Sequence, residues 1–346
     1  MYDVPPKKML ILNILDILKK YSDENNRLSN KKIREKLKSE YSQTVDRKAI
    51  KRNLDNLIDF GYDIEYSETT RKGKNGEEET ISSDWYLNRE FVDAELRLLI
   101  DSLLFSKHIP YNQCKELVEK LEGLSNTYFK SRVKHIRTMP ERLPENKQIL
   151  YTIEILDEAI TKKKRVEFNY MTNFGTDKKP IISTEKDGSP KNYIVSPYQM
   201  AATNGRYYLI CNQKTRKDIG YYRLDRISSI RMLDEPATPT KEIPQLKNGL
   251  NLPKIMAENI YMFPGESKHV KFRAKRQAIR DILDWFGQDV TFMDDGEEFV
   301  IANVLVNEQA MVFWALQYGQ VIEVLKPERL RKKIGEAAKA IAGKYE

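Results

Sequence analysis

Two short stretches decide the fold of the central part of this chain: NGRYYLICNQ, residues 204–213, and YYRLDRIS, residues 221–228. Each places a tyrosine doublet beside arginine and alternates its side chains with the period of two that is typical of a β-strand. Two similar segments precede them, RVEFNYM at 165–171 and NYIVSPYQMAA at 192–202, and Gly and Asn residues fall between segments. Short strands separated by such turn residues predict a small β-barrel over residues 165–235.

The arginines in these strands allow two interpretations. Alternation puts Arg206 and Tyr208 on one face of the first strand, and Arg223 and Asp225 on one face of the second. If the two strands are neighbours, Arg206, Tyr208 and Arg223 form, together with Arg226, a concave patch that is suited to stacking bases and pairing with phosphates. Alternatively, the tyrosines stabilise cross-strand pairs and Asp225 or another carboxylate neutralises Arg223. Spacing alone leaves both interpretations open.

The N-terminal residues 1–90 predict a winged helix-turn-helix. Apolar residues recur at helical spacing in 7–21, in KKIREKLKSEY at 31–41, and in 44–60. Ser29 is placed as an N-cap, and Gly61 ends the third helix. YDIEYS at 62–67 and DWYLN at 84–88 then predict two strands around a long polar loop.

Positive charge is concentrated in this first region. The chain has 59 Lys plus Arg against 51 Asp plus Glu, a formal net charge of +8, and residues 27–52 alone hold ten basic against three acidic residues. The third helix is amphipathic, so its basic residues fall on the side that a recognition helix presents to the major groove. A solvated basic helix is the alternative. The predicted DNA-binding residues are Arg47, Lys48, Lys51 and Arg52 on the third helix, Lys31, Lys32 and Thr44 as backbone contacts, and Arg71, Lys72 and Lys74 in the wing.

The remaining segments predict an α+β multidomain chain. Residues 91–164 have helical periodicity throughout and form a connector that we expect to take part in dimerisation. Residues 236–267 include a Pro-rich linker. Residues 268–346 alternate strand and helix patterns in the order βαββαβ plus a final helix, which predicts a ferredoxin-like domain.

No motif indicates an enzyme. Cys114 and Cys211 are the only cysteines, which implies neither a disulfide framework nor a zinc cluster and is typical of a reducing cytoplasm. His108, His135 and His269 are scattered without metal-ligand spacing, and no phosphate-binding loop or nucleophile elbow is present. The N-terminal stretch is interrupted by polar residues, so we expect neither a signal peptide nor a membrane span. We therefore expect no catalysis, cofactor or metal.

Three of these stretches, in order and at compatible spacing, resemble the WYL-domain transcriptional regulators of bacteria. They are SPY at 196–198, NGRYYL at 204–209 and RLDRI at 223–227, with Tyr207 where the family has its naming tryptophan. The resemblance covers nearly the whole chain, since the winged helix is similar and GQVIEVLKPERLRKKI at 319–334 resembles the C-terminal extension of the family. It implies an Sm-like or SH3-like barrel that binds a regulatory nucleic acid or nucleotide. The implied ligand-binding residues are Ser196, Tyr198, Arg206, Tyr208, Arg223 and Arg226.

The sequence thus predicts a ligand-responsive transcriptional regulator that binds a palindromic operator as a homodimer. Repression is favoured slightly, because a dimer on a palindrome can occlude a promoter. The resemblance also suggests a link to phage defence, since some family members control defence operons. Two alternatives stay open: a nucleic-acid-processing enzyme that holds its substrate in the barrel, and a constitutive architectural DNA-binding protein.

Overall fold

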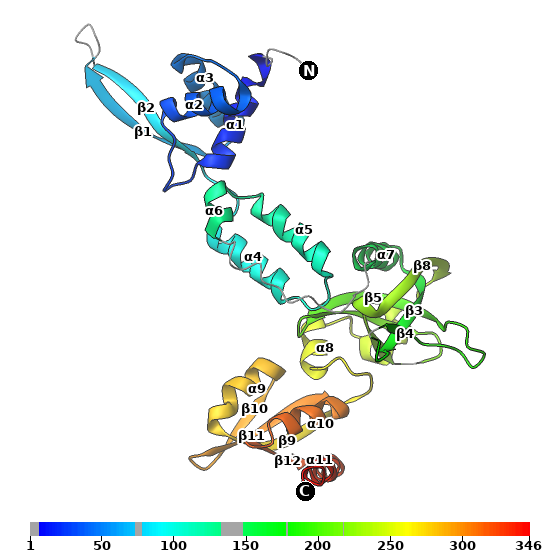
Figure 1. The fold of residues 1–346 in the computed structure, drawn as a ribbon. Helices are drawn as coiled ribbons and strands as arrows, with labels where there is room; N and C mark the ends of the chain where they lie inside the picture. Colours follow the sequence, from blue (N-terminus) through cyan, green and yellow to red (C-terminus); the bar gives the residue numbers. More distant parts are fainter. Residues whose placement is uncertain (1–6, 73–77, 133–147, 178, 217) are drawn as a thin grey trace. The chain divides into compact units, whose positions relative to one another are not determined.

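The computed structural model describes residues 7–72, 78–132, 148–177, 179–216 and 218–346. The chain divides into two compact units, one made of Met1–Ser106 and Tyr111–Arg142 and the other of Lys107–Pro110 and Leu143–Glu346. Figure 1 shows the elements of each unit. Among the described helices, none is both long enough and apolar enough to cross a membrane.

The first unit begins with three helices and a two-stranded antiparallel sheet, in the order that the sequence predicts. The elements are a 3-10 turn Lys7–Met9, α1 (Leu10–Tyr21), α2 (Asn30–Tyr41), α3 (Arg47–Phe60), β1 (Ile64–Lys72) and β2 (Glu78–Leu87). Ile17, Ile33, Leu54 and Trp85 are fully buried in their common core. The apolar stripe of each helix therefore faces the other two, and their charged residues are left outside.

The ends of α2 and α3 follow from local hydrogen bonding. The Ser29 hydroxyl accepts the Lys32 N–H at 3.3 Å and so caps α2, as the sequence predicts. The Asp46 carboxylate accepts the Ala49 N–H at 2.7 Å, which starts α3 at Arg47 rather than near residue 44. Gly61 ends α3 in the left-handed conformation with φ 109°, which costs a glycine little.

The predicted connector is divided between the two units. The helices α4 (Asp93–Phe105), α5 (Tyr111–Glu122) and α6 (Thr127–Arg132) belong to the first unit, whereas α7 (Ile149–Lys162) belongs to the second. Ile149, Leu156 and Ala159 of α7 are buried in one core with Val166 and Leu209 of the following sheet. This helix is therefore part of the sheet domain, because its apolar face covers one side of the sheet.

The central sheet contains the two tyrosine-rich stretches. Its strands are β3 (Lys164–Phe174), β4 (Pro180–Ile182), β5 (Asn192–Thr203), β6 (Arg206–Gln213), β7 (Ile219–Arg223) and β8 (Ile227–Pro236). They pair in the order β4-β3-β5-β6-β7, and β8 pairs with β3. Asn204 and Gly205 form the two-residue turn between β5 and β6, both at positive φ, as Asn-Gly hairpin turns do.

The closed barrel predicted for residues 165–235 is not found, because the pairing among the described strands is open between β7 and β8. A 3-10 turn, Leu224–Arg226, separates these strands, and its Leu224 is fully buried in the core. The turn redirects the chain, so that β8 runs back to β3 instead of pairing with β7.

The segment after β8 is packed against the sheet and is not a bare linker. It contains the 3-10 turns Thr240–Glu242 and Pro244–Leu246 and the helix α8 (Leu252–Glu258). Ile243, Leu246 and Met262 are buried in a second core beside Ile210 of β6. Tyr198, Tyr208 and Tyr221 pack against the same core. Both faces of the strands β5 to β7 therefore carry packed apolar side chains.

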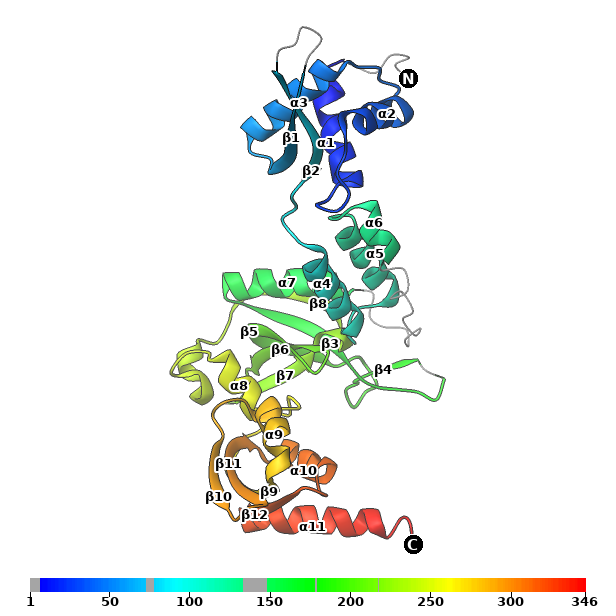
Figure 2. The ribbon, with the colours of Figure 1, turned by 90° about the vertical axis from the view of Figure 1, so that its left-hand side faces the viewer.

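The C-terminal domain follows the predicted βαββαβ order with a final helix. Its elements are β9 (Ser267–Lys275), a 3-10 turn Arg276–Ala278, α9 (Ile279–Phe286), β10 (Thr291–Asp295), β11 (Phe299–Asn307), α10 (Glu308–Gln317), β12 (Ile322–Lys326) and α11 (Glu328–Ala342). The strands are antiparallel in the order β10-β11-β9-β12. Figure 2 shows α9 and α10 on one side of these strands, where Phe272, Phe286 and Trp314 form the core.

Candidate functional site

The basic residues predicted on the third helix all lie on its exposed side. Arg47, Lys48, Lys51 and Arg52 are exposed on the first two turns of α3, whereas Ile50, Leu54 and Leu57 are buried. The structure shows no ion pair for these four cations within its described part. Their charge is therefore available to a polyanion.

The other predicted DNA-binding residues lie on α2, just before α3 and in the wing. Thr44 is exposed just before α3, and Lys31 and Lys32 are exposed in the first turn of α2, where Lys31 makes a loose 3.9 Å ion pair with Glu35. The backbones of Arg71 and Lys72 pair with β2 at the end of β1, and Lys74 lies outside the described residues. Arg34 and Lys38 are two further exposed cations of α2, which helical spacing from Lys31 would have identified.

Two of the three predicted ligand-binding arginines, Arg206 and Arg223, converge on one carboxylate. Arg223 donates from Nε to Asp225 Oδ1 at 3.0 Å and from a terminal nitrogen to Oδ2 at 2.5 Å. Arg206 donates to the same Oδ2 at 3.3 Å and to the Lys107 backbone oxygen at 2.8 Å. The Asp225 side chain is only 7% exposed, whereas those of Arg206 and Arg223 are 29% and 21% exposed. Asp225 thus holds both guanidinium groups at the surface.

Two tyrosines complete this group, which we call the arginine–tyrosine cluster: Tyr170, Arg206, Tyr208, Arg223, Asp225 and Arg226. Tyr208 lies directly opposite Arg223 in the β6–β7 register, and the Arg223 N–H donates to the Tyr170 hydroxyl at 3.1 Å. Arg226 is partly exposed and has no ion pair with another described residue. Three arginines against one carboxylate leave two positive charges in excess, and this excess favours an anionic ligand.

Burial outweighs the nearby arginines at both phenols of the cluster and raises their pKa. Burial raises the pKa of Tyr208, and the nearby Arg223, Arg206 and Arg226 offset part of that effect. Burial likewise raises the pKa of Tyr170, against the opposing influence of Arg226 and Arg223. Both hydroxyls therefore keep their protons at neutral pH. The sequence did not identify Tyr170, because its place in the cluster follows from the pairing of β3 with distant β8.

Ser196 and Tyr198 hold the chain that follows β8, and Ser196 lies opposite Asn212, at the other end of β6 from Arg206. The Ser196 hydroxyl, 1% exposed, accepts the Thr238 N–H at 2.9 Å, and the Tyr198 hydroxyl donates to the Thr238 backbone oxygen at 2.9 Å. Burial raises the pKa of Tyr198 to about 12. These two predicted ligand-binding residues therefore have a structural role in the geometry observed.

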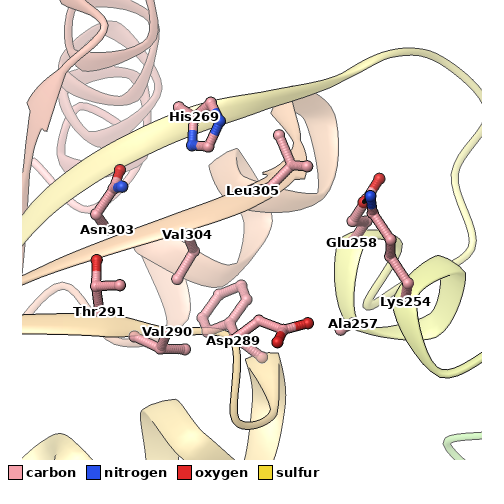
Figure 3. A pocket seen from close by; sticks show the side chains of 11 residues that line it. Lys254, Ala257, Glu258, His269, Asp289, Val290, Thr291, Asn303, Val304 and Leu305 are labelled. Carbon is pink, nitrogen blue, oxygen red and sulfur yellow. Dashed lines mark ion pairs between the residues drawn. The ribbon is translucent and has the colours of Figure 1, made fainter.

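One cavity lies between α8 and the C-terminal sheet, with a volume of about 300 Å³. Lys254 and Glu258 of α8 face His269 and Leu305 of the strands across it, with Asp289 at the base (Figure 3). Within the described part of the chain, no group of three or more His, Cys, Asp or Glu side chains is placed to hold a metal ion. Cys114 and Cys211 are both buried as free thiols.

Comparison with protein families identifies the class. A WYL domain matches residues 151–232, and a WCX domain matches residues 266–342. The chain therefore contains a WYL domain and a WCX domain, and its resemblance to the WYL-domain transcriptional regulators is confirmed. The WYL match begins inside α7, consistent with the packing of that helix on the sheet.

Among individual proteins, the chain is similar to YobV of Bacillus subtilis (strain 168), described as an uncharacterized HTH-type transcriptional regulator, with 23% identity over 151 residues. That match covers 43% of this chain and 46% of YobV, so it spans about half of the relative. Among solved structures, PafBC of Arthrobacter aurescens aligns over 96% of this chain and 48% of its own, with 14% identity and a TM-score of 0.31. A CRISPR Cas-related protein aligns over 97% of this chain and 85% of its own, with 12% identity and a TM-score of 0.37.

Proposed function

We propose that this protein is a ligand-responsive, DNA-binding transcriptional regulator. In this proposal residues 1–90 are a winged helix-turn-helix, the helices α4 to α6 are a connector, the open central sheet with α7 is a sensor, and residues 268–346 are a ferredoxin-like extension. The observation that carries the proposal is the set of exposed cations on the first two turns of α3, unpaired among the described residues.

The α3 surface supports duplex recognition for two reasons. The buried stripe of α3 fixes the helix against α1 and α2, so its basic side points outward as a rigid unit. Arginine can bond guanine through two donors, whereas lysine meets phosphate as a point charge. We assign base reading to Arg47 and phosphate contact to Lys51.

The arginine–tyrosine cluster supports an anionic effector. Asp225 preorganises Arg206 and Arg223, which lowers the entropy lost when a phosphate binds. The ring of Tyr208 packs against the segment that leads to the C-terminal domain. An effector bound at the cluster can shift the arrangement of the DNA-binding units only if the effector binds one arrangement more tightly than the other. We further propose a homodimer on a palindromic operator and repression as its output.

One experiment tests the whole proposal. Footprinting on DNA around its own gene, with and without short oligonucleotides, should show a protected palindrome whose protection changes when the oligonucleotide is added. Arg206→Ala should abolish the response to oligonucleotide and leave the footprint intact. Absence of any protected sequence would contradict the DNA-binding part, and an unaltered response in Arg206→Ala would contradict the sensor part.

The ion pairs of Asp225 favour a second candidate, a constitutive DNA-binding protein in which the cluster only stabilises the sheet. Bidentate pairing of Arg223 with a buried carboxylate is also what a purely structural cluster would show. This candidate predicts that Arg226→Gln, which removes a cation without an ion pair among the described residues, changes neither stability nor regulation. The sensor predicts a weaker ligand response in the same variant.

A further inference from the structure

The C-terminal sheet has one face that its helices do not cover. Val270, Phe272 and Ala274 of β9 are buried against α9 and α10, so the alternating residues of that strand point to the opposite side. The same alternation holds in β11, where Val300, Ala302 and Val304 are buried. In Figure 2 the strands have α9 and α10 on one side only.

The uncovered face carries a row of cations beside apolar side chains. Lys271, Arg273 and Lys275 follow one another at every second position of the central strand β9, roughly 6.6 Å apart at the usual rise of a strand. Phe299 lies opposite Lys275, and Ile301 opposite Arg273, on the neighbouring strand β11. Met293, which pairs with Ile301 from β10, is 59% exposed. We call these six residues the sheet platform.

One ion pair and one cation–π contact organise the platform without cancelling its charge. Arg273 donates to Asp295 at 2.6 Å, and its guanidinium lies over the Phe299 ring at 4.0 Å from the centroid. Asp295 thus helps to hold the guanidinium over the ring, where the Arg273–Phe299 pair can stack with a planar group. Lys326 of β12 lies opposite Lys271 and adds a fourth cation to the face, against the two carboxylates of Asp295 and Glu323.

One end of this face is already occupied. The cavity between α8 and the sheet is lined by His269, Asn303 and Leu305 at that end (Figure 3). The platform lies toward the other ends of β9 and β11, where Lys275 and Phe299 are located. An occupant therefore has access to the platform without displacing α8.

We propose that the sheet platform binds single-stranded nucleic acid. Phosphates would meet Lys271, Lys275 and Lys326, and bases would stack on the Arg273–Phe299 pair and rest on Ile301 and Met293. Single-stranded nucleic acid has unpaired bases, so it can use both the cations and the stacking pair on the central strands of this sheet. A duplex hides the faces of its bases, so it could use only the lysines. None of the platform residues belongs to α3 or to the arginine–tyrosine cluster.

The test compares the full-length protein with two double variants of equal charge change. Lys271→Gln with Lys275→Gln removes two platform cations, and Lys332→Gln with Lys333→Gln removes two exposed cations of α11 that are not part of the platform. Binding of a labelled single-stranded oligonucleotide is measured by fluorescence anisotropy over a range of salt concentrations, and the duplex of the same sequence serves as competitor. The platform variant should weaken binding and lower the slope of log K against log salt by about 1.4, because each single-strand phosphate that a lysine neutralises adds about 0.7 to that slope. The α11 variant should match the wild type.

A third and a fourth variant separate the platform from the proposed sensor. Phe299→Leu should weaken single-strand binding on the order of fivefold with little change in the salt slope, because it removes stacking and not charge. Arg226→Gln tests the arginine–tyrosine cluster. If only Arg226→Gln weakens binding, the platform proposal is overturned and the sensor proposal stands. If only the platform variants weaken binding, the platform proposal stands and the arginine–tyrosine cluster is not the oligonucleotide sensor.

Sedimentation of the same samples tests a different occupant. Should the platform variant change the oligomeric state while its oligonucleotide affinity equals that of the wild type, the face joins two copies of this chain and the nucleic-acid proposal is overturned. Equal affinity of all four variants and the wild type would overturn it as well.

Discussion

Arg223 and Asp225, two residues apart in the chain, form a two-point ion pair at 3.0 and 2.5 Å across the end of β7. After Arg223 the backbone enters the 3-10 segment Leu224–Arg226, which contains Asp225, and this change of direction brings the two side chains to the same side. Arg206 reaches the same carboxylate from β6. A single buried acid therefore fixes two arginines that lie 17 residues apart in the sequence.

Replacing Asp225 should both lower the stability of the fold and strengthen polyanion binding. Asp225→Asn removes charge-assisted hydrogen bonds from two partly buried guanidinium groups, so we expect a loss of about 1–3 kcal/mol in the free energy of unfolding. The arginine–tyrosine cluster also gains one net positive charge. Urea unfolding and oligonucleotide titration measure the two effects. Asp234→Asn, at a fully exposed carboxylate of β8, is the control and should change neither.

Ser196→Ala should destabilise the sheet domain through the chain after β8. The substitution leaves the Thr238 N–H without its buried acceptor, which costs about 1–3 kcal/mol. Denaturant unfolding measures the loss, and the response to oligonucleotide should survive. Wild-type stability together with a lost response would instead show that Ser196 contacts the ligand.

The α3 surface gives a prediction about salt. Arg47→Ala and Lys51→Ala should each weaken duplex binding, and Lys51→Ala should flatten the salt slope by about one unit if it meets one phosphate. Arg47→Ala should also reduce discrimination between duplex sequences, since we assign it to base reading. Lys115→Ala, at an exposed position of α5, is the control. Unchanged affinity in both α3 variants would remove α3 from the interface.

The partly buried Tyr198 predicts a loss of stability in alkali. Burial raises the pKa of Tyr198 from 10.0 to about 12, so between these values the folded state keeps a proton that the unfolded state has lost. The stabilising contribution is complete below pH 10, and it falls as the pH rises toward 12. Tyr198→Phe should make stability less dependent on pH in that window, as measured by denaturant unfolding at several pH values. An identical dependence in the variant would show that other groups control it.

Much of the local structure could be predicted from the sequence, because it depends on short-range chemistry. The N-cap Ser29, the terminator Gly61 and the turn Asn204–Gly205 each act through hydrogen bonds or backbone conformations within a few residues. The alternation of β9 and β11 likewise identifies their buried faces without knowledge of their partners.

The errors arose where a segment needed a distant partner. The helix α7 has the same periodicity as the helices of the connector, and only its packing with Val166 and Leu209 assigns it to the sheet. The Pro-rich composition after β8 predicted a linker, but Ile243 and Leu246 are buried against a face of the sheet that was expected to bind ligand.

The sequence by itself determined the strand pattern, the amphipathic helices, the positions of the cations and the family resemblance, since each depends on spacing along the chain. Only the tertiary structure decided that the sheet stays open, that Ser196 and Tyr198 hold Thr238, and that Asp225 joins Arg206 to Arg223. The physical reason is that strand register and burial bring together side chains from separate segments, and a periodic pattern specifies which face a residue occupies but not what covers that face.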